Sequence, residues 1–200
     1  MRILALSGSL RRVSTNTALL QAAAALAPAG VAVSVESALG TLPHFNPDLD
    51  GAEPPAVRDF HSRVRDADGL LISSPEYAHG VPGVLKNAFD WLVGSIHFPG
   101  KPVAAFNANP QATCAQAALR ETLTVMNAHI IEEASLALPL QGRDLDAAGI
   151  QTNPELAAAV RAAMTAFVRA IAAGSDGQNA GPGLAAARAI VARRPIPPRH

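Results

Sequence analysis

The sequence predicts an α/β fold in which a parallel sheet is covered by helices on both faces. Short apolar runs alternate along the chain with longer amphipathic stretches, which is the pattern of repeated strand–helix units. Strands that are joined through helices pair in parallel, and such sheets are buried on both sides. A length of 200 residues suits one domain with a substantial core.

The elements are expected in a regular order. Strands are predicted over residues 3–6, 31–35, 69–73, 103–106 and 130–136. Helices are predicted over residues 15–27, 54–66, 82–93, 112–127 and 154–173, where apolar residues recur three and four positions apart. Pro82 suits a first helical turn, and Asn153 followed by Pro154 is typical of a cap and a first helical residue. We expect the strand order 2-1-3-4-5, with ligands at the carboxyl ends of strands 1, 3 and 4.

Two segments fall outside this repeat. The connection over residues 37–51 is long, and long structured loops are commonly functional or cover a partner surface. Residues 174–200 begin as a Gly/Ser/Asn-rich linker and include one short alanine-rich segment, 184–193, which is marginal as an isolated helix. The predicted organisation is one domain over residues 1–173 and a flexible or partner-docking tail over residues 174–200.

Composition narrows the class of protein. Sixteen basic and sixteen acidic residues cancel, which gives no electrostatic reason to expect nucleic acid or an anionic membrane as a partner. The longest apolar stretches are expected to be too short to span a bilayer. The only cysteine, Cys114, excludes an intrachain disulfide. Together these features favour a cytoplasmic protein.

The first motif lies between the first predicted strand and helix. The strand ends in Ser7-Gly8-Ser9, and two arginines and several hydroxyl and amide residues come before the helix. Backbone N–H groups at a helix start bind anions, and Ser9, Arg11, Ser14 and Asn16 add side-chain donors: these residues suit a phosphate. The alternative is that Ser14 and Thr15 only cap the helix and the arginines face water.

The spacing of this motif excludes two familiar phosphate sites. Gly8 stands alone, whereas a dinucleotide fingerprint needs three glycines. The segment has no lysine, which a Walker loop requires. A terminal monophosphate such as that of FMN remains the best candidate.

The second motif follows the third predicted strand. A buried run ends in Pro75-Glu76-Tyr77, and a Gly/Pro-punctuated loop leads into the next helix. This position lies at the sheet edge where the fold predicts a ligand. Tyr77 and main-chain groups nearby suit a flat heteroaromatic ring, although such loops are also common without a ligand.

Together the motifs resemble the NADPH-dependent FMN reductase family, whose members include chromate, quinone and azo-dye reductases with a flavodoxin-like three-layer fold. The resemblance covers residues 1–173. It rests on three pieces: GSLRRVSTN (8–16), LPHFNPDLD (42–50) and PEYAHGVPGVLKNAFDWL (75–92).

The resemblance implies roles for individual residues. It implies that FMN phosphate is bound by Ser9, Arg11, Ser14 and Asn16. It implies that the flavin ring and ribityl chain lie along Pro75, Glu76, Tyr77 and Ala78, and that Asn107 begins a third flavin-contacting loop. Family members often have asparagine at the position of Ala78, and their third loop is glycine-rich, whereas residues 107–113 contain no glycine here.

The implied activity needs no catalytic side chain, because the cofactor carries the hydride. We expect ping-pong transfer from NADPH or NADH through FMN to small-molecule electron acceptors such as quinones, chromate, azo compounds or free flavin. No nucleophile motif and no zinc-ligand spacing is found, so neither catalytic nor metal-binding residues are predicted. The alternative function is an FMN-binding electron carrier or regulatory module without enzymatic activity.

A homodimer or homotetramer is expected. The helix over residues 82–93 places Leu85, Phe89 and Leu92 toward the sheet. Val84, Ala88 and Trp91 would then form an exposed apolar strip, which is typical of a subunit interface. The alternative is that Trp91 completes the core of its own subunit.

Overall fold

The predicted parallel sheet and its strand order are confirmed. The structure, a computed structural model, describes residues 1–36, 38–143 and 145–178. The strands are β1 (Arg2–Ser7), β2 (Ala32–Glu36), β3 (Gly69–Ser73), β4 (Pro102–Asn107), β5 (His129–Ile130) and β6 (Leu136–Ala137). They run in the order β2-β1-β3-β4-β5, all pairs are parallel, and β6 also pairs with β4.

The prediction of one continuous last strand over residues 130–136 is wrong. A single 3-10 turn, η3 (Glu132–Ala134), separates β5 from β6. The Ser135 hydroxyl accepts a hydrogen bond from the Ala105 N–H at 3.2 Å and donates to the Ile131 carbonyl at 3.1 Å. The Ser135 hydroxyl thus takes the place of a backbone carbonyl beside β4. The backbone of η3 can therefore leave the sheet while the Ala105 N–H keeps a hydrogen-bond partner.

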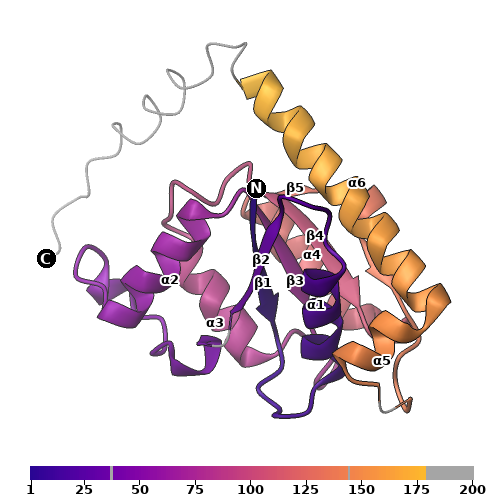
Figure 1. The fold of residues 1–200 in the computed structure, drawn as a ribbon. Helices are drawn as coiled ribbons and strands as arrows, with labels where there is room; N and C mark the ends of the chain where they lie inside the picture. Colours follow the sequence, from indigo (N-terminus) through magenta and orange to yellow (C-terminus); the bar gives the residue numbers. More distant parts are fainter. Residues whose placement is uncertain (37, 144, 179–200) are drawn as a thin grey trace, which may run out of the picture.

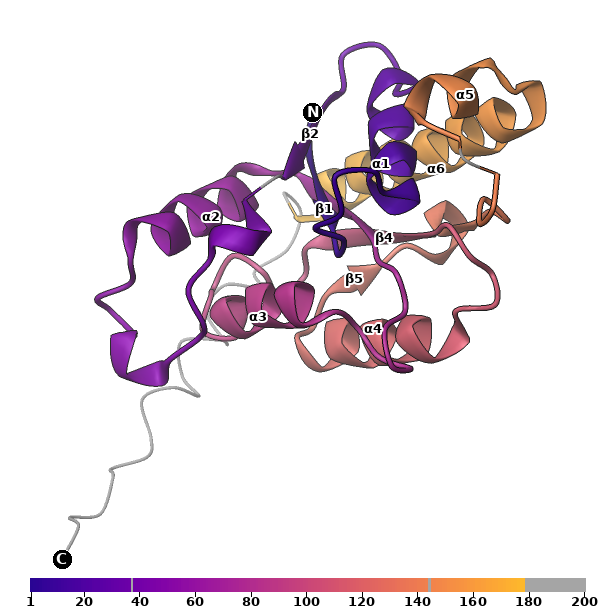
Figure 2. The same cartoon turned by 90° about the horizontal axis from the view of Figure 1, so that it is seen from below.

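Helices cover both faces of the sheet, which gives three layers. One face carries α1 (Thr15–Ala25), α5 (Ala147–Thr152) and α6 (Pro154–Gln178), and the other carries α2 (Pro55–Asp66), α3 (Gly83–Leu92) and α4 (Thr113–Val125), as Figures 1 and 2 show. Successive residues of β1 alternate between the two cores: Ile3 packs under α1 and α6, and Leu4 packs under α2 and α3.

The predicted helices all exist, with ends that differ by a few residues. The short helix α5 was not predicted, because six residues are too few to show a helical period. Helix α6 continues to Gln178, past the predicted end at residue 173. The rest of the predicted tail, including the segment 184–193, lies outside the described residues.

Helix α6 corrects the expectation that every apolar stretch is too short to span a membrane. Pro154–Gly174 is long and apolar enough by length and composition. In this fold, however, Val160, Met164 and Phe167 are fully buried, and they belong to the same core cluster as residues of β1, β3 and β4. Their spacing of three and four residues makes α6 the core helix of one layer.

The loop before α2 is hydrogen-bonded to α3. This contact corrects the expectation that Trp91 lies in an exposed apolar strip. The Trp91 indole N–H donates to the Pro43 carbonyl at 2.8 Å. The Asn87 amide N–H donates to the same carbonyl, and Asn87 Oδ1 accepts from the Phe45 N–H. Trp91 is only 4% exposed and Ala88 is fully buried. Of the predicted apolar strip on α3, only Val84 is therefore partly exposed, and Trp91 completes the core of its own chain.

Candidate functional site

Buried polar side chains gather where the central strands end. Ser7, Ser9, Ser73, Ser74 and Asn107 are all buried, and all lie at or just after the carboxyl ends of β1, β3 and β4. Buried hydroxyl and amide groups are costly unless they have partners. Their concentration at this edge marks it as a site for a polar ligand, as expected for a doubly wound sheet.

Gly8 allows the loops that follow β1 and β3 to touch. Its N–H donates to the Ser73 carbonyl at 2.8 Å. A Cβ at this position would lie 2.6 Å from Ser74 Oγ and 3.2 Å from Ser74 Cα. Glycine is therefore required for the close approach of the two segments that carry both predicted motifs.

The start of α1 forms a cluster of hydrogen-bond donors. Ser14 is the N-cap and accepts a hydrogen bond from the Thr17 N–H, so its predicted capping role is confirmed. Ser14 also lines the adjacent cavity. The first N–H groups of the helix, those of Thr15 and Asn16, have no carbonyl partner within it. Asn16 Oδ1 accepts from the Ser73 hydroxyl at 2.9 Å, which leaves its amide N–H groups to donate. Among the described residues, the Arg11 guanidinium has no carboxylate partner.

These donors surround one cavity of about 220 Å³. Eight of the nine predicted site residues line it: Ser9, Arg11, Ser14, Asn16, Pro75, Glu76, Tyr77 and Asn107. The remaining wall comes from Thr15, Ser74, Ala108, Asn109, Ala112 and Gln141. The structure thus brings the two sequence motifs and the end of β4 together around a common space.

Ala78 is the predicted residue that does not line the cavity. Tyr77 and Gly80 exchange two backbone hydrogen bonds, and the turn between them places Ala78 at φ 49° and His79 at φ 57°. Two successive positive φ values define a turn that favours asparagine and glycine. Alanine meets this backbone requirement only with strain, whereas asparagine tolerates it better.

Glu76 connects this loop to α4. Its Oε2 accepts a hydrogen bond from the Ala115 N–H at 2.8 Å, in the first turn of a helix whose N-cap, Ala112, has no side chain able to cap it. A carboxylate at a helix N-terminus is stabilised by the exposed N–H groups and the helix dipole. Glu76 therefore holds the second motif against the third loop.

The third loop is built by asparagine side chains instead of glycines. Asn107 Oδ1 accepts from the Asn109 N–H at 2.9 Å, and Asn109 Oδ1 accepts from the Gln111 N–H at 3.1 Å. No residue from 107 to 113 has a positive φ. These Asx turns shape the loop without glycine, so its composition is compatible with the cavity.

A larger apolar groove of about 840 Å³ adjoins the polar cavity. Arg11 and Tyr77 line both spaces. The groove is formed by the loops after β1 and β2 and by the start of α3, with Leu10, Leu42 and Val84 among its apolar residues. A donor-rich cavity that opens onto an apolar groove suits a ligand with an anionic end and a flat apolar end.

Several cavity residues were not predicted from the sequence. Ser74 directly follows a buried strand, and that position could have identified it. Asn109 belongs to the expected third loop, although it was not named as a site residue. Gln141 gave no signal, because it reaches the cavity from the loop after β6. The placement of Gln141 at the cavity depends on tertiary structure alone.

Comparison with known proteins identifies the family. Residues 1–142 match the family model described as NADPH-dependent FMN reductase. The chain belongs to the NADPH-dependent FMN reductase family. It is 38% identical over 159 residues to an NAD(P)H-dependent FMN reductase of Pseudomonas aeruginosa, covering 73% of this chain and 85% of that protein. It is 35% identical over 155 residues to a 2-hydroxy-1,4-benzoquinone reductase of a Burkholderia species, covering 74% of this chain and 84% of that protein.

A solved structure supports the same assignment. The flavoenzyme FerB of Paracoccus denitrificans, an NAD(P)H:(acceptor) oxidoreductase, superposes with a TM-score of 0.76 and 29% identity, covering 85% of this chain and 96% of that one. The flavodoxin-like fold is therefore confirmed, and the chain is an oxidoreductase of a family that uses FMN and NAD(P)H.

Proposed function

We propose that this FMN reductase family member binds FMN in the polar cavity and transfers electrons from NADPH or NADH to quinones. The observation that carries the proposal is the set of donors aimed at one space: the Arg11 guanidinium, the Asn16 amide and the first N–H groups of α1. No carboxylate of the described residues neutralises Arg11, so an anion fits there.

The donor set suits a terminal phosphate. Ser9, Arg11, Ser14 and Asn16 offer charged and neutral donors to a dianion, and an adenylate attached to that phosphate would replace one of its charges with bulk. FMN is therefore favoured over FAD. The flavin would be held along Pro75, Glu76 and Tyr77, with the backbone of Ala78 at the turn and Asn107 at the third loop.

The protein's contribution is binding, orientation and exclusion of water. When bound, FMN supplies the hydride chemistry that no side chain of the chain provides. The apolar groove beside Tyr77 offers an aromatic, weakly hydrated surface to a nicotinamide and then to an acceptor. Use of one groove by both substrates in turn predicts ping-pong kinetics.

Quinones are the favoured acceptors because the apolar groove suits flat neutral rings and because the Burkholderia relative is named a benzoquinone reductase. Chromate, azo compounds and free flavin are further candidates. We place the reaction in the cytoplasm, where NADPH and NADH are supplied.

We also propose that the working unit is a homodimer or homotetramer. Leu10 is 59% exposed and Tyr77 51% exposed at the edge of the groove, which leaves an apolar surface beside the site. A second subunit seated there would close the groove.

Steady-state kinetics with FMN-loaded protein test the proposed function. Benzoquinone, chromate, an azo dye and free FMN are each varied against NADPH and NADH. Parallel double-reciprocal plots with benzoquinone, and its highest kcat/KM, are the expected result. Intersecting plots would contradict the shared groove, and an absence of turnover with every acceptor would favour an electron carrier.

A further inference from the structure

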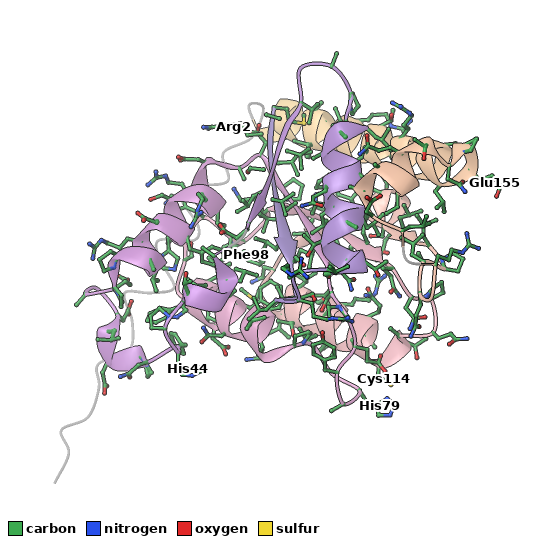
Figure 3. All side chains as sticks on the ribbon, turned by 60° about the horizontal axis from the view of Figure 1, so that its bottom comes forward. Arg2, His44, His79, Phe98, Cys114 and Glu155 are labelled. Atoms are coloured by element: carbon green, nitrogen blue, oxygen red, sulfur yellow. The ribbon has the colours of Figure 1, made fainter. Side chains whose placement is uncertain are left out.

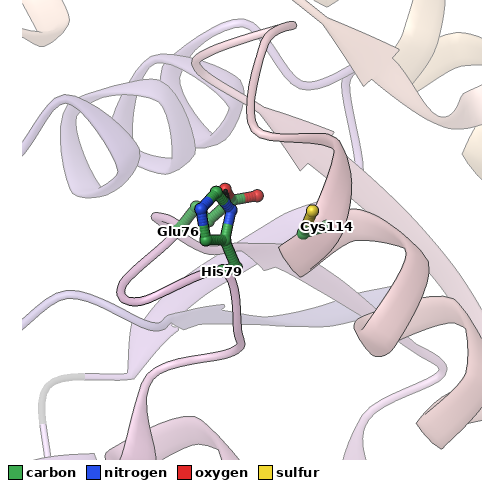
Figure 4. Close-up of side chains that lie close together, drawn as sticks. All are labelled: Glu76, His79 and Cys114. Atoms are coloured by element: carbon green, nitrogen blue, oxygen red, sulfur yellow. Dashed lines mark ion pairs between the residues drawn. The ribbon is translucent and has the colours of Figure 1, made fainter.

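A second cluster of reactive side chains lies beside the cavity. Glu76, His79 and Cys114 each offer a ligand atom, and these atoms all lie within 4.8 Å of one another. Figure 3 shows His79 and Cys114 next to each other at one edge of the molecule, and Figure 4 shows their side chains with Glu76. The residues come from the turn after β3 and the first turn of α4, so their sequence spacing gave no sign of a metal site.

The three atoms match the ligand set of zinc. Thiolate sulfur, imidazole nitrogen and carboxylate oxygen bind Zn²⁺ at about 2.0–2.3 Å, which places neighbouring ligands of a tetrahedron about 3.3–3.7 Å apart. His79 Nδ1 already lies 3.2 Å from Glu76 Oε1. Cys114 and His79 are exposed, so their side chains are free to rotate until the three ligand atoms reach this spacing.

The backbone holds this cluster in place. Glu76 Oε2 is bonded to the Ala115 N–H, which orients the carboxylate and leaves Oε1 toward His79. The paired hydrogen bonds between Tyr77 and Gly80 fix the turn that carries His79. Outer hydrogen bonds of this kind orient metal ligands and are part of a metal site.

Charge and ligand type select the cation. A glutamate carboxylate and a cysteine thiolate together balance a divalent charge. A sulfur ligand favours Zn²⁺ and similar ions over Mg²⁺ and Ca²⁺, which prefer oxygen. Three protein ligands leave a fourth position for water, as in open zinc sites.

We propose that Glu76, His79 and Cys114 form a site for one zinc-class divalent cation at the junction of the Tyr77–Gly80 turn and α4. The bound ion would tie this turn to the start of α4. Both segments border the polar cavity, through Tyr77 and Ala112. The metal would thus stiffen one wall of the proposed flavin site, to which its ligand Glu76 also contributes.

Metal titration of the full-length, tag-free protein tests the site. Equilibrium dialysis with Zn²⁺ should give one ion per chain. Co²⁺ should give tetrahedral visible absorption and a thiolate charge-transfer band, which only Cys114 can produce because it is the only cysteine. Cys114→Ser and His79→Ala should each weaken Zn²⁺ binding at least about tenfold, the smallest loss expected even for an outer-shell change. The matched control His97→Ala, at an exposed histidine outside the cluster, should leave it unchanged.

Two results would overturn the proposal. One is Zn²⁺ binding that is equal in the wild type and in both cluster variants. The other is a Co²⁺ complex without the thiolate band. Circular dichroism of the variants checks that they fold, and a Zn²⁺-induced rise in Tm that is lost in Cys114→Ser provides an independent measure. All of these measurements use protein without FMN, so they do not depend on the proposed reductase activity.

Discussion

At the scale of single residues, Arg11 is the strongest test of the phosphate site. Charge-assisted hydrogen bonds contribute about 1.5–3 kcal/mol each. Arg11→Ala should therefore lower the affinity for FMN by about ten- to a hundredfold. Isothermal titration with FMN measures this loss. Arg12→Ala is the matched control, because Arg12 does not line the cavity and its loss should leave affinity unchanged. Equal losses of FMN affinity in the two variants would indicate general electrostatic attraction instead of a defined phosphate site.

Ala78 carries a separate prediction about backbone strain. A non-glycine residue at positive φ costs about 1 kcal/mol, and asparagine tolerates this conformation better than alanine. Ala78→Asn should raise the free energy of unfolding by up to about 1 kcal/mol. Urea denaturation measures the change, with Ala52→Asn as a control at an exposed residue that lacks a positive φ. A loss of stability at Ala78 would show that the turn is not strained in this way.

At the scale of elements, contact between the loops after β1 and β3 depends on Gly8. The Cβ of Gly8→Ala would lie 2.6 Å from Ser74 Oγ and 3.2 Å from Ser74 Cα, so the Ser74 side chain and its backbone must shift. We expect a loss of about 1–3 kcal/mol in the free energy of unfolding, together with weaker FMN binding. Gly94→Ala is the control, because a Cβ at Gly94 meets no atom within 4 Å. Unchanged stability and FMN affinity in Gly8→Ala would show that the loops adjust without cost.

Element types could be predicted from the sequence where local patterns decide them. The first four strands, to within one residue at each end, and the Ser14 cap of α1 carried local signals, and they are confirmed. The break between β5 and β6 could not be predicted, because it depends on the Ser135 hydroxyl meeting the Ala105 N–H of another strand. The burial of Trp91 depends in the same way on Pro43, which comes from a distant loop.

The residues of the site also fall into those that local sequence predicts and those that tertiary packing brings together. Residues that directly follow strands 1 and 3 could be assigned, since the fold brings strand ends to one edge. Gln141 and the cluster of Glu76, His79 and Cys114 could not be assigned, because they meet only through tertiary packing. The Asx turns of Asn107 and Asn109 give the third loop its shape without glycine.

At the scale of the whole molecule, the exposed apolar rim of the groove predicts self-association. Light scattering should give a mass that is a multiple of the 20.6 kDa chain. Leu10→Glu should lower that mass, because it places a charge in the proposed interface. Ile96→Glu, at a residue that is 85% exposed outside the groove, should not lower it. A monomer that binds FMN and turns over quinone would contradict the proposed assembly.

Electron transfer by the whole molecule is proposed to pass through the bound cofactor, and anaerobic stopped-flow mixing measures this transfer. Protein loaded with FMN is mixed with NADPH or NADH, and the absorption of oxidised flavin is followed. We expect rapid bleaching, followed by full recovery of the absorption when benzoquinone is added from a second syringe. Persistence of the oxidised flavin absorption with both nucleotides would contradict it.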